Sequence, residues 1–104
     1  MICRMWHGMT PRAKADAYAA LLEQRALSGY RAVPGNLSAY ILRRDEAEVT
    51  HFMTVTYWES EECVRAFTGD DVLTARYFPE DEEFLLEFEP FVQHYTVAAE
   101  MRAT

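Results

Sequence analysis

Hydrophobic and polar positions alternate most clearly over residues 49–58, where β-branched and aromatic side chains dominate. Successive side chains of a strand point to opposite faces, so Phe52 and Trp58 share one face and Met53 and Tyr57 share the other. Both faces are largely apolar or only weakly polar. The pattern therefore predicts a strand that is covered on both sides.

Three other stretches with strand-like composition are residues 2–9, 36–44 and 91–101. The second of them follows a Pro34-Gly35 turn signal and precedes the polar loop of residues 45–48. Because that loop is short, this strand is predicted to form an antiparallel hairpin with the strand that follows it.

A first helix is predicted over residues 11–28, which are rich in good helix formers. Thr10 is expected to act as N-cap, Pro11 to occupy the first helical position and Gly29 to end the helix in a left-handed conformation. The side of this helix expected to face the sheet consists of Ala13, Ala17, Ala20, Leu21 and Gln24, with Tyr18 and Leu22 beside it.

A second helix is predicted over residues 61–67, with Ser60 as N-cap and Gly69 as the residue that breaks it. Asp70 is expected to cap a further short helix over residues 71–77. A turn is predicted over residues 78–81. The acidic stretch that follows, residues 82–89, is compatible with either a helical turn or a short extended arm.

The predicted order of elements is β-α-β-β-α-β, which is the α+β, ferredoxin-like arrangement. Its four-stranded antiparallel sheet has both helices on one face. The other face would expose an apolar patch too large for a stable monomer. We therefore predict a homodimer in which two sheets pack face to face, a dimeric α+β barrel.

The chain has 104 residues, which predicts one domain over residues 1–104. No apolar run approaches the roughly 20 residues of a membrane span, and the first residues lack the features of a signal peptide, so we expect a cytoplasmic protein. Cys3 and Cys63 are then expected to be reduced, buried thiols, with a disulfide or a metal pair as the less favoured alternative.

Net charge is −7, and residues 59–89 hold eleven acidic side chains against two basic ones. An acidic surface repels phosphate backbones and anionic lipids, so neither nucleic acid nor membrane is an expected partner.

Several short motifs together resemble the antibiotic biosynthesis monooxygenase family of the dimeric α+β barrel superfamily. They are Arg4-Met5-Trp6-His7-Gly8, Pro34-Gly35-Asn36, Trp58-Glu59-Ser60, Ala66-Phe67 with Gly69-Asp70, Tyr77-Phe78-Pro79-Glu80-Asp81, and Pro90 followed by His94-Tyr95. The resemblance covers nearly the whole chain. It implies a pocket between the sheet and the helices, and oxidation of aromatic or quinol-like substrates by dioxygen without a cofactor. It also implies that Trp58 lines this pocket.

Haem-degrading relatives in the same superfamily share an asparagine on the first strand, a pocket tryptophan and an iron-binding histidine near the second helix. This chain keeps only the tryptophan, because residues 2–9 contain no asparagine and residues 60–80 no histidine. The resemblance therefore implies no haem, unless His7, His51 or His94 binds iron from a different wall.

His94 is the candidate catalytic base, because histidine titrates near neutral pH and can accept a substrate proton. The alternative is a hydrogen-bonded histidine at the dimer interface. The candidate substrate-binding residues are Trp58, Trp6, Phe67, Tyr77, Phe78 and Arg76. For Trp58 the alternative is core packing, and for Tyr77 and Phe78 the choice is between a lid over the pocket and anchors of a turn.

The arginines are expected to be structural. Arg4 shares a strand face with Trp6, and only one of Trp6 and His7 can face the helices. A buried Arg4 would need a carboxylate or an anionic ligand, and pairing with a local acid is the favoured account. Arg76 could hold an acidic or phenolate oxygen at the pocket mouth. The simpler account is an ion pair with Asp70, Asp71 or Glu80.

The leading hypothesis is a homodimeric, cofactor-independent monooxygenase of a small apolar, aromatic molecule. Two alternatives stay open: a non-catalytic dimer that only binds a hydrophobic molecule, and a haem-binding or haem-degrading protein.

Overall fold

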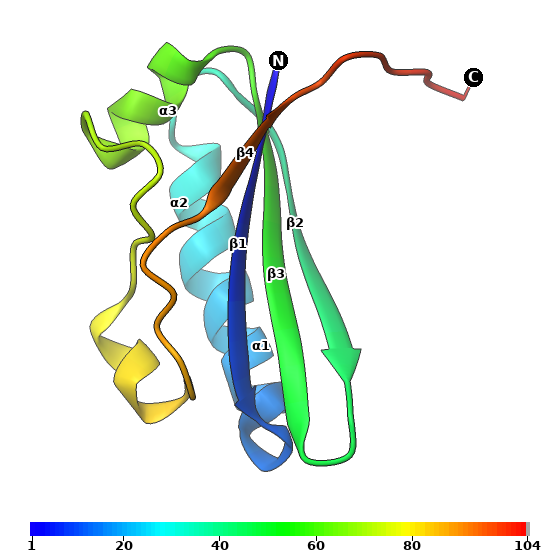
Figure 1. Ribbon diagram of the computed structural model, residues 1–104, viewed down its shortest axis with the longest axis vertical. Coiled ribbons are helices and arrows are strands. Elements are labelled where there is room, and N and C mark those ends of the chain that lie inside the picture. Colours follow the sequence, from blue (N-terminus) through cyan, green and yellow to red (C-terminus); the bar gives the residue numbers. More distant parts are fainter. Residues whose placement is uncertain (104) are drawn as a thin grey trace.

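The computed structural model describes residues 1–103 and contains one four-stranded sheet with helices on one side of it (Figure 1). The strands are β1 (Ile2–Pro11), β2 (Asn36–Asp45), β3 (Val49–Trp58) and β4 (Gln93–Thr96). The helical segments are η1 (Arg12–Lys14), α1 (Ala15–Leu22), η2 (Glu23–Leu27), α2 (Ser28–Arg31), α3 (Glu61–Thr68) and η3 (Pro79–Glu83). The strand order is β2-β3-β1-β4, and every pairing is antiparallel, which confirms the predicted ferredoxin-like α+β fold.

The pairing register assigns each side chain to one of two sheet faces. Trp6 lies opposite Thr54 and Arg4 lies opposite both Thr56 and His94. Trp6 packs in a core cluster with residues of α1, so this face is the one that the helices cover. His7 lies on the other face, which we call the open face. The question of whether Trp6 or His7 faces the helices is therefore resolved in favour of Trp6.

The first helix begins later and ends later than predicted. Thr10 and Pro11 continue β1, where they pair with Thr50 and Val49, so the N-cap role predicted for Thr10 is wrong. The helical path runs on through η2 and α2 to Arg31, and Gly29 lies inside it without a positive φ. Its buried residues differ from the predicted alanine stripe and are Ala15, Tyr18, Leu22 and Ala26.

Replacing Gly29 by alanine should stabilise the protein, because Gly29 lies inside a helix. A Cβ added at Gly29 meets no atom within 4 Å. Because alanine has the higher helix propensity and the less flexible unfolded state, Gly29→Ala should raise the free energy of unfolding by about 0.5–1 kcal/mol. Urea denaturation measures it. Gly69→Ala is the matched control: Gly69 has φ 80°, so the same substitution there should destabilise.

After β3, the structure confirms the helix predicted over residues 61–67 and a strand within residues 91–101, but not the helix predicted between them. Helix α3 is capped by the Ser60 hydroxyl, which accepts a hydrogen bond from the Cys63 N–H, and Gly69 ends it. The predicted helix over residues 71–77 is absent, and Thr74 instead forms a bridge with Phe91.

The remaining C-terminal segments agree with the predictions in part. Residues 78–81 turn as predicted, within the start of the 3₁₀ helix η3, whose last residues 82–83 fit the helical-turn alternative, whereas residues 84–89 are irregular. The last strand is four residues long rather than eleven.

Two hydrophobic clusters fill the space between the sheet and the helices. The larger one surrounds Trp6, Tyr18 and Phe52, and the smaller one surrounds Trp58 and Val64. Tyr30 of α2 packs against both clusters. The boundary between the clusters is where the site described below lies.

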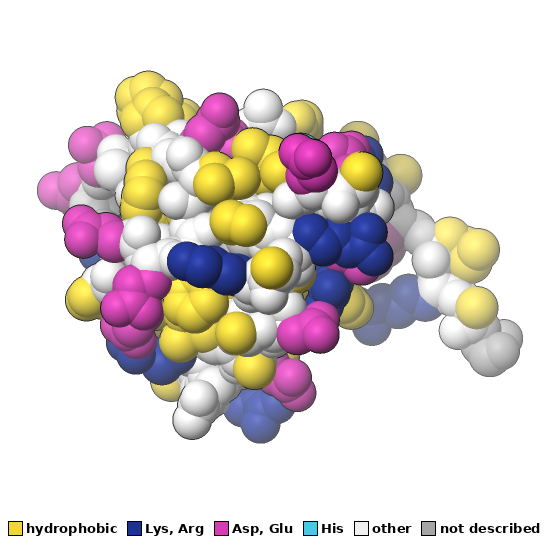
Figure 2. Space-filling model, turned by 90° about the horizontal axis from the view of Figure 1, so that it is seen from below, with side chains coloured by type: hydrophobic (Ala, Val, Ile, Leu, Met, Phe, Trp, Pro, Cys, Tyr) yellow, Lys and Arg dark blue, Asp and Glu magenta, His cyan; other side chains and the backbone are white. Residues whose placement is uncertain are grey.

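The surface of the molecule is mixed in charge on the side seen in Figure 2, from below. Acidic and basic side chains there are interspersed with hydrophobic ones rather than gathered by sign. Within residues 1–103, no helix is long and apolar enough to cross a membrane. Cys3 and Cys63 are both free thiols; Cys3 is buried as predicted, whereas Cys63 is only partly buried.

Candidate functional site

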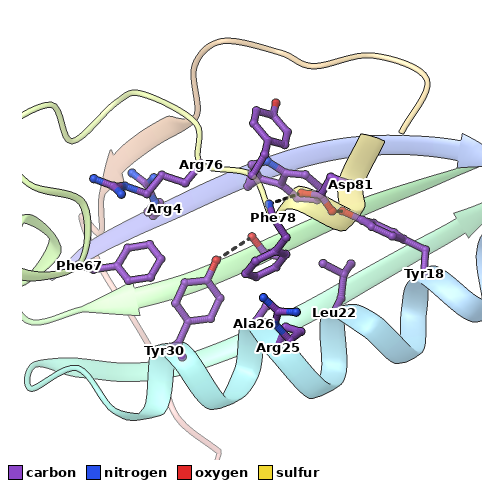
Figure 3. A pocket seen from close by; sticks show the side chains of 14 residues that line it. Arg4, Tyr18, Leu22, Arg25, Ala26, Tyr30, Phe67, Arg76, Phe78 and Asp81 are labelled. Atoms are coloured by element: carbon purple, nitrogen blue, oxygen red, sulfur yellow. Dashed lines mark hydrogen bonds between the residues drawn. The ribbon is translucent and has the colours of Figure 1, made fainter. Parts of the chain in front are cut away.

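A cavity of about 290 Å³ lies between the helices and the sheet (Figure 3). Helical segments α1, η2 and α2 supply one wall, β1 and β3 the floor, and α3 with residues 76–81 the remaining side. The lining residues are Arg4, Trp6, Tyr18, Leu22, Arg25, Ala26, Gly29, Tyr30, Thr54, Phe67, Arg76, Tyr77, Phe78 and Asp81. Small-molecule sites in proteins occupy about 300–1,000 Å³, so the cavity suits a small ligand.

The middle of the cavity is aromatic. Trp6 meets Tyr77 edge to face, with ring centroids 6.0 Å apart, and Tyr30 meets Phe67 at 5.2 Å. The Trp6 side chain is buried. The flat rings that line the cavity suit an aromatic ligand.

Two guanidinium groups lie side by side at one end of the cavity, as Figure 3 shows. Arg4 is buried, and Arg76 is exposed at the mouth. Arg4 donates to the carbonyl oxygens of Val72 and, at 3.4 Å, Thr74. Arg76 donates to the carbonyl oxygen of Thr68.

Neither of these two arginines forms an ion pair with a carboxylate of residues 1–103. The predicted pairing of Arg4 and of Arg76 with local acids is therefore wrong. For Arg76 the physical reason is direction: its side chain turns back to the end of α3, and Glu80 pairs with Arg25 instead. Burial, together with the nearby Arg76, lowers the pKa of Arg4. This end of the cavity consequently has positive charge that no side chain neutralises.

The opposite end of the cavity contains a buried carboxyl group, that of Asp81. One of its oxygens accepts a hydrogen bond from the Tyr18 hydroxyl at 3.0 Å, and the other accepts from the Phe78 N–H at 2.7 Å. Burial raises the pKa of Asp81 despite these two donors. Burial and the Asp81 charge raise the pKa of Tyr18, so its hydroxyl stays protonated and donates.

His94 lies beside the cavity rather than in its wall. It is on β4 directly opposite Arg4, and its Nε2 atom is 2.9 Å from Arg4 Nη1. Arginine can only donate, so Nε2 accepts and the imidazole is neutral. Burial and the Arg4 charge both lower the pKa of His94. His94 therefore holds the guanidinium that faces the cavity, and its role as a base stays a prediction.

Trp58 lies behind the cavity and is absent from its lining. Its side chain is fully buried, and its indole N–H donates to the Thr56 hydroxyl at 2.8 Å. Its ring centroid is 5.9 Å from that of Phe67, which does line the cavity. The other five candidate substrate-binding residues all line the cavity: Trp6, Phe67, Tyr77, Phe78 and Arg76.

His7 and His51 lie on the open face, away from the cavity. His7 Nε2 is 3.0 Å from His51 Nδ1, while the remaining ring nitrogens contact Glu89 and, at 3.3 Å, Glu46. Each imidazole is thus engaged by its neighbours on that face. No group of three or more histidine, cysteine or acidic side chains within residues 1–103 is arranged to hold a metal ion.

Sequence reasoning missed the lining residues that the helices and β3 supply, above all Tyr18, Ala26, Tyr30 and Thr54. The signal available for Tyr18 was its position next to the predicted helix stripe. Tyr30 was missed because Gly29, the residue before it, was expected to end the helix.

Comparisons with known proteins give a family and a fold for the chain. A family model described as antibiotic biosynthesis monooxygenase matches residues 1–75. Among solved structures, the heme-degrader MhuD from Mycobacterium tuberculosis, with two hemes bound in its active site, is 19% identical. That match covers 98% of this chain and 100% of the other, with a TM-score of 0.66.

A second similar structure is a monooxygenase from the gene ActVA-Orf6 of Streptomyces coelicolor, in complex with the ligand nanaomycin D. It is 19% identical, covers 99% of this chain and 92% of its own, and has a TM-score of 0.64. At such identities the likeness shows the fold alone. No curated protein matches the chain.

Proposed function

The chain belongs to the antibiotic biosynthesis monooxygenase family, and on that premise we propose that it is a cofactor-independent monooxygenase of a small, electron-rich aromatic molecule of the quinol type. The observation that supports this most directly is the aromatic cavity with positive charge at one end. A ring would lie between Trp6, Tyr30 and Phe67, with an oxygen substituent toward Arg4 and Arg76.

In such a reaction the substrate supplies the electrons. An anthrone, for example, has a CH₂ group that becomes C=O: one atom of O₂ enters the product, and the other leaves as water with the two hydrogens. The protein must favour the substrate's anion, since that form reacts with oxygen. Fixed donors and cations in a site shielded from water are well suited to this. Arg4 and Arg76 supply the charge, and the buried wall excludes water.

Haem does not fit the residues that line this cavity. They include no histidine, cysteine or methionine, which are the common axial ligands of haem iron. The hydroxyls of Tyr18 and Tyr77 already donate to Asp81 and to the Glu89 carbonyl, and Tyr30 is 3.5 Å from the Thr54 hydroxyl. His7 and His51 are on the opposite side of the sheet, and His94 is outside the lining with its Nε2 accepting from Arg4. We therefore derive no step through haem for this chain.

A homodimer is the assembly that the open face supports. Tyr40, Leu42 and Tyr95 are each about half exposed there, at 53%, 49% and 51%. No helix of residues 1–103 covers this face. We expect two copies to pack sheet to sheet, in one domain per copy and in the cytoplasm, without involvement of nucleic acid or membrane.

Oxygen consumption tests the proposed function. The purified protein should consume O₂ with anthrone or a naphthohydroquinone at a rate well above the spontaneous one. Ala26→Phe should reduce this rate at least about tenfold, because the added ring would fill the cavity from η2. Saturable binding without oxygen uptake would identify the chain as a ligand-binding protein instead.

Variants of His94 distinguish a base from a positioning residue. Glutamine can accept the hydrogen bond from Arg4 but cannot take a substrate proton. If His94 only positions Arg4, His94→Gln should keep most of the activity that His94→Ala loses, and the pH dependence of kcat/KM should not change. If His94 is the base, both variants should be equally inactive while their dimers stay folded. Normal turnover in His94→Ala would remove both roles.

A further inference from the structure

The positive end of the cavity suggests more about the ligand than its aromatic character. Arg4 has 4% of its surface exposed, and its hydrogen-bond partners are two carbonyl oxygens and a neutral imidazole. None of these groups has a formal negative charge. Arg76 lies beside it and raises the local positive charge further.

Buried cations are normally paired, because removing a charge from water costs several kcal/mol unless an opposite charge replaces the solvent. A third arginine of the same cavity, although exposed, is paired with an acid. Arg25 forms an ion pair with Glu80 and lies over the Phe78 ring at 5.0 Å. The chain has seventeen acidic residues, eleven of them within residues 59–89, yet none pairs with Arg4 or Arg76.

The guanidinium groups are also held in place. Arg4 is fixed from three directions by Val72, Thr74 and His94. A planar guanidinium that is already oriented loses little freedom on binding and can hold both oxygens of a carboxylate. Phenolate, the anion of a quinol, offers one such oxygen, whereas a carboxylate offers two. Two guanidinium groups side by side therefore match the two oxygens of a carboxylate better than the single oxygen of a phenolate.

We propose that the ligand of this cavity is an aromatic carboxylic acid, whose carboxylate lies between Arg4 and Arg76 while its ring lies against Phe67, Tyr30 and Trp6. The proposal rests on the proposed function for the identity of the cavity as the substrate site. It adds the chemical class of the substrate. His94 is then a positioning residue for the anion site, since it contacts the guanidinium and not the ligand.

The experiment uses two matched probes that cannot be oxidised under the assay conditions, 2-naphthoate and 2-naphthamide. They share size and ring, and differ in charge. Isothermal titration calorimetry on the full chain should show 2-naphthoate binding at least about tenfold more tightly, the difference expected for charge-assisted hydrogen bonds. Arg4→Met and Arg76→Met should each weaken 2-naphthoate at least about tenfold and leave 2-naphthamide within about threefold.

Arg25→Met is the control, because Arg25 also lines the cavity but is already neutralised by Glu80. It should change the affinity for both probes equally. Arg4→Met removes contacts to the segment around Thr74, so its fold is checked by circular dichroism. If Arg4→Met does not fold, Arg76→Met decides the question alone, since Arg76 is exposed and has a single hydrogen bond.

Equal affinity for the acid and the amide, or an equal loss of both in Arg76→Met, would overturn the anion site. The comparison of the two affinities does not depend on the outcome of the oxygen assay. Oxygen uptake with a neutral hydroquinone but no preference for the acid leaves the proposed function standing. A clear preference for 2-naphthoate without any oxygen uptake, including with 1,4-dihydroxy-2-naphthoate, supports the anion site and removes the monooxygenase.

Discussion

Asp81→Ala should destabilise the protein by roughly 2–4 kcal/mol, which is a large share of the about 5–15 kcal/mol that stabilises a typical domain. The substitution removes the acceptor for two donors. The Tyr18 hydroxyl is fully buried and would lose its partner, and the Phe78 N–H would lose its capping oxygen. Thermal unfolding should show a fall in Tm of at least about 10 °C.

The same prediction has an internal control in Tyr18→Phe, which removes the donor instead of the acceptor. The double variant Tyr18→Phe/Asp81→Ala should be less destabilised than the sum of the two single variants, by about 1 kcal/mol. The reason is that it no longer contains a buried hydroxyl without a partner. Strictly additive effects would show that the Tyr18–Asp81 hydrogen bond contributes nothing.

The effect of Asp81→Ala should also depend on pH, in a direction set by the pKa of Asp81. Burial raises that pKa in the folded protein, so the folded state holds the proton more tightly than the unfolded chain does. The stability that the folded state gains by holding the Asp81 proton is complete below the ordinary pKa of 3.8. It is lost as the pH rises through the raised pKa of Asp81 in the folded protein. The destabilisation by Asp81→Ala should therefore be larger at pH 4 than at pH 7. The opposite trend would mean that ionised Asp81 is the favoured form.

The hairpin of β2 and β3 could be predicted from the sequence, because there each residue type agrees with its place in a strand. β3 was predicted with its bounds as observed, and its alternation grouped Phe52 and Trp58 on one face, which the structure identifies as the helix-facing one. Helix α3 was equally predictable, because Ser60 and Gly69 are local signals at its two ends. In both elements the tertiary contacts reinforce the local preferences.

The boundaries of the first helix could not be predicted, because contacts distant in sequence decide them. Thr10 has the chemistry of an N-cap, but its pairing with Thr50 extends β1 past it. Gly29 has the chemistry of a helix end, but Tyr30 packs on Trp58 and Phe67 and keeps the helix going. Local propensity is a weak preference that such packing overrides.

The aromatic lining of the site could be predicted from the sequence, but the hydrogen-bond partners of its arginines could not. Five aromatic or basic candidates line the cavity, whereas Trp58, which the family resemblance favoured, lies one layer behind Phe67. The arginines were expected to find acids because acids are abundant nearby in the sequence. Nearness in sequence does not show which way a side chain points. Arg4 on β1 donates to the carbonyl oxygen of Val72, a loop residue 68 positions later.

The second large effect is expected from a substitution on the open face. Leu42→Lys should convert the proposed dimer to monomers. Leu42 lies on β2 opposite Met53, and His7 follows on the next strand. In a two-fold symmetric dimer each substitution is present twice, so two ammonium groups would be buried in an apolar contact. We expect the dimer dissociation constant to rise at least about a hundredfold.

Analytical ultracentrifugation over a range of concentrations measures this constant. Leu73→Lys is the matched control, since Leu73 is 46% exposed and Leu42 is 49% exposed. Leu73 lies outside the four strands and follows Val72, whose carbonyl accepts from the helix-facing Arg4. Because both leucines are half exposed, neither substitution should change monomer stability by more than about 0.5 kcal/mol. A Leu42→Lys protein that still dimerises as tightly as the unsubstituted chain would show that copies associate through a different surface, and the sheet-to-sheet barrel would have to be abandoned.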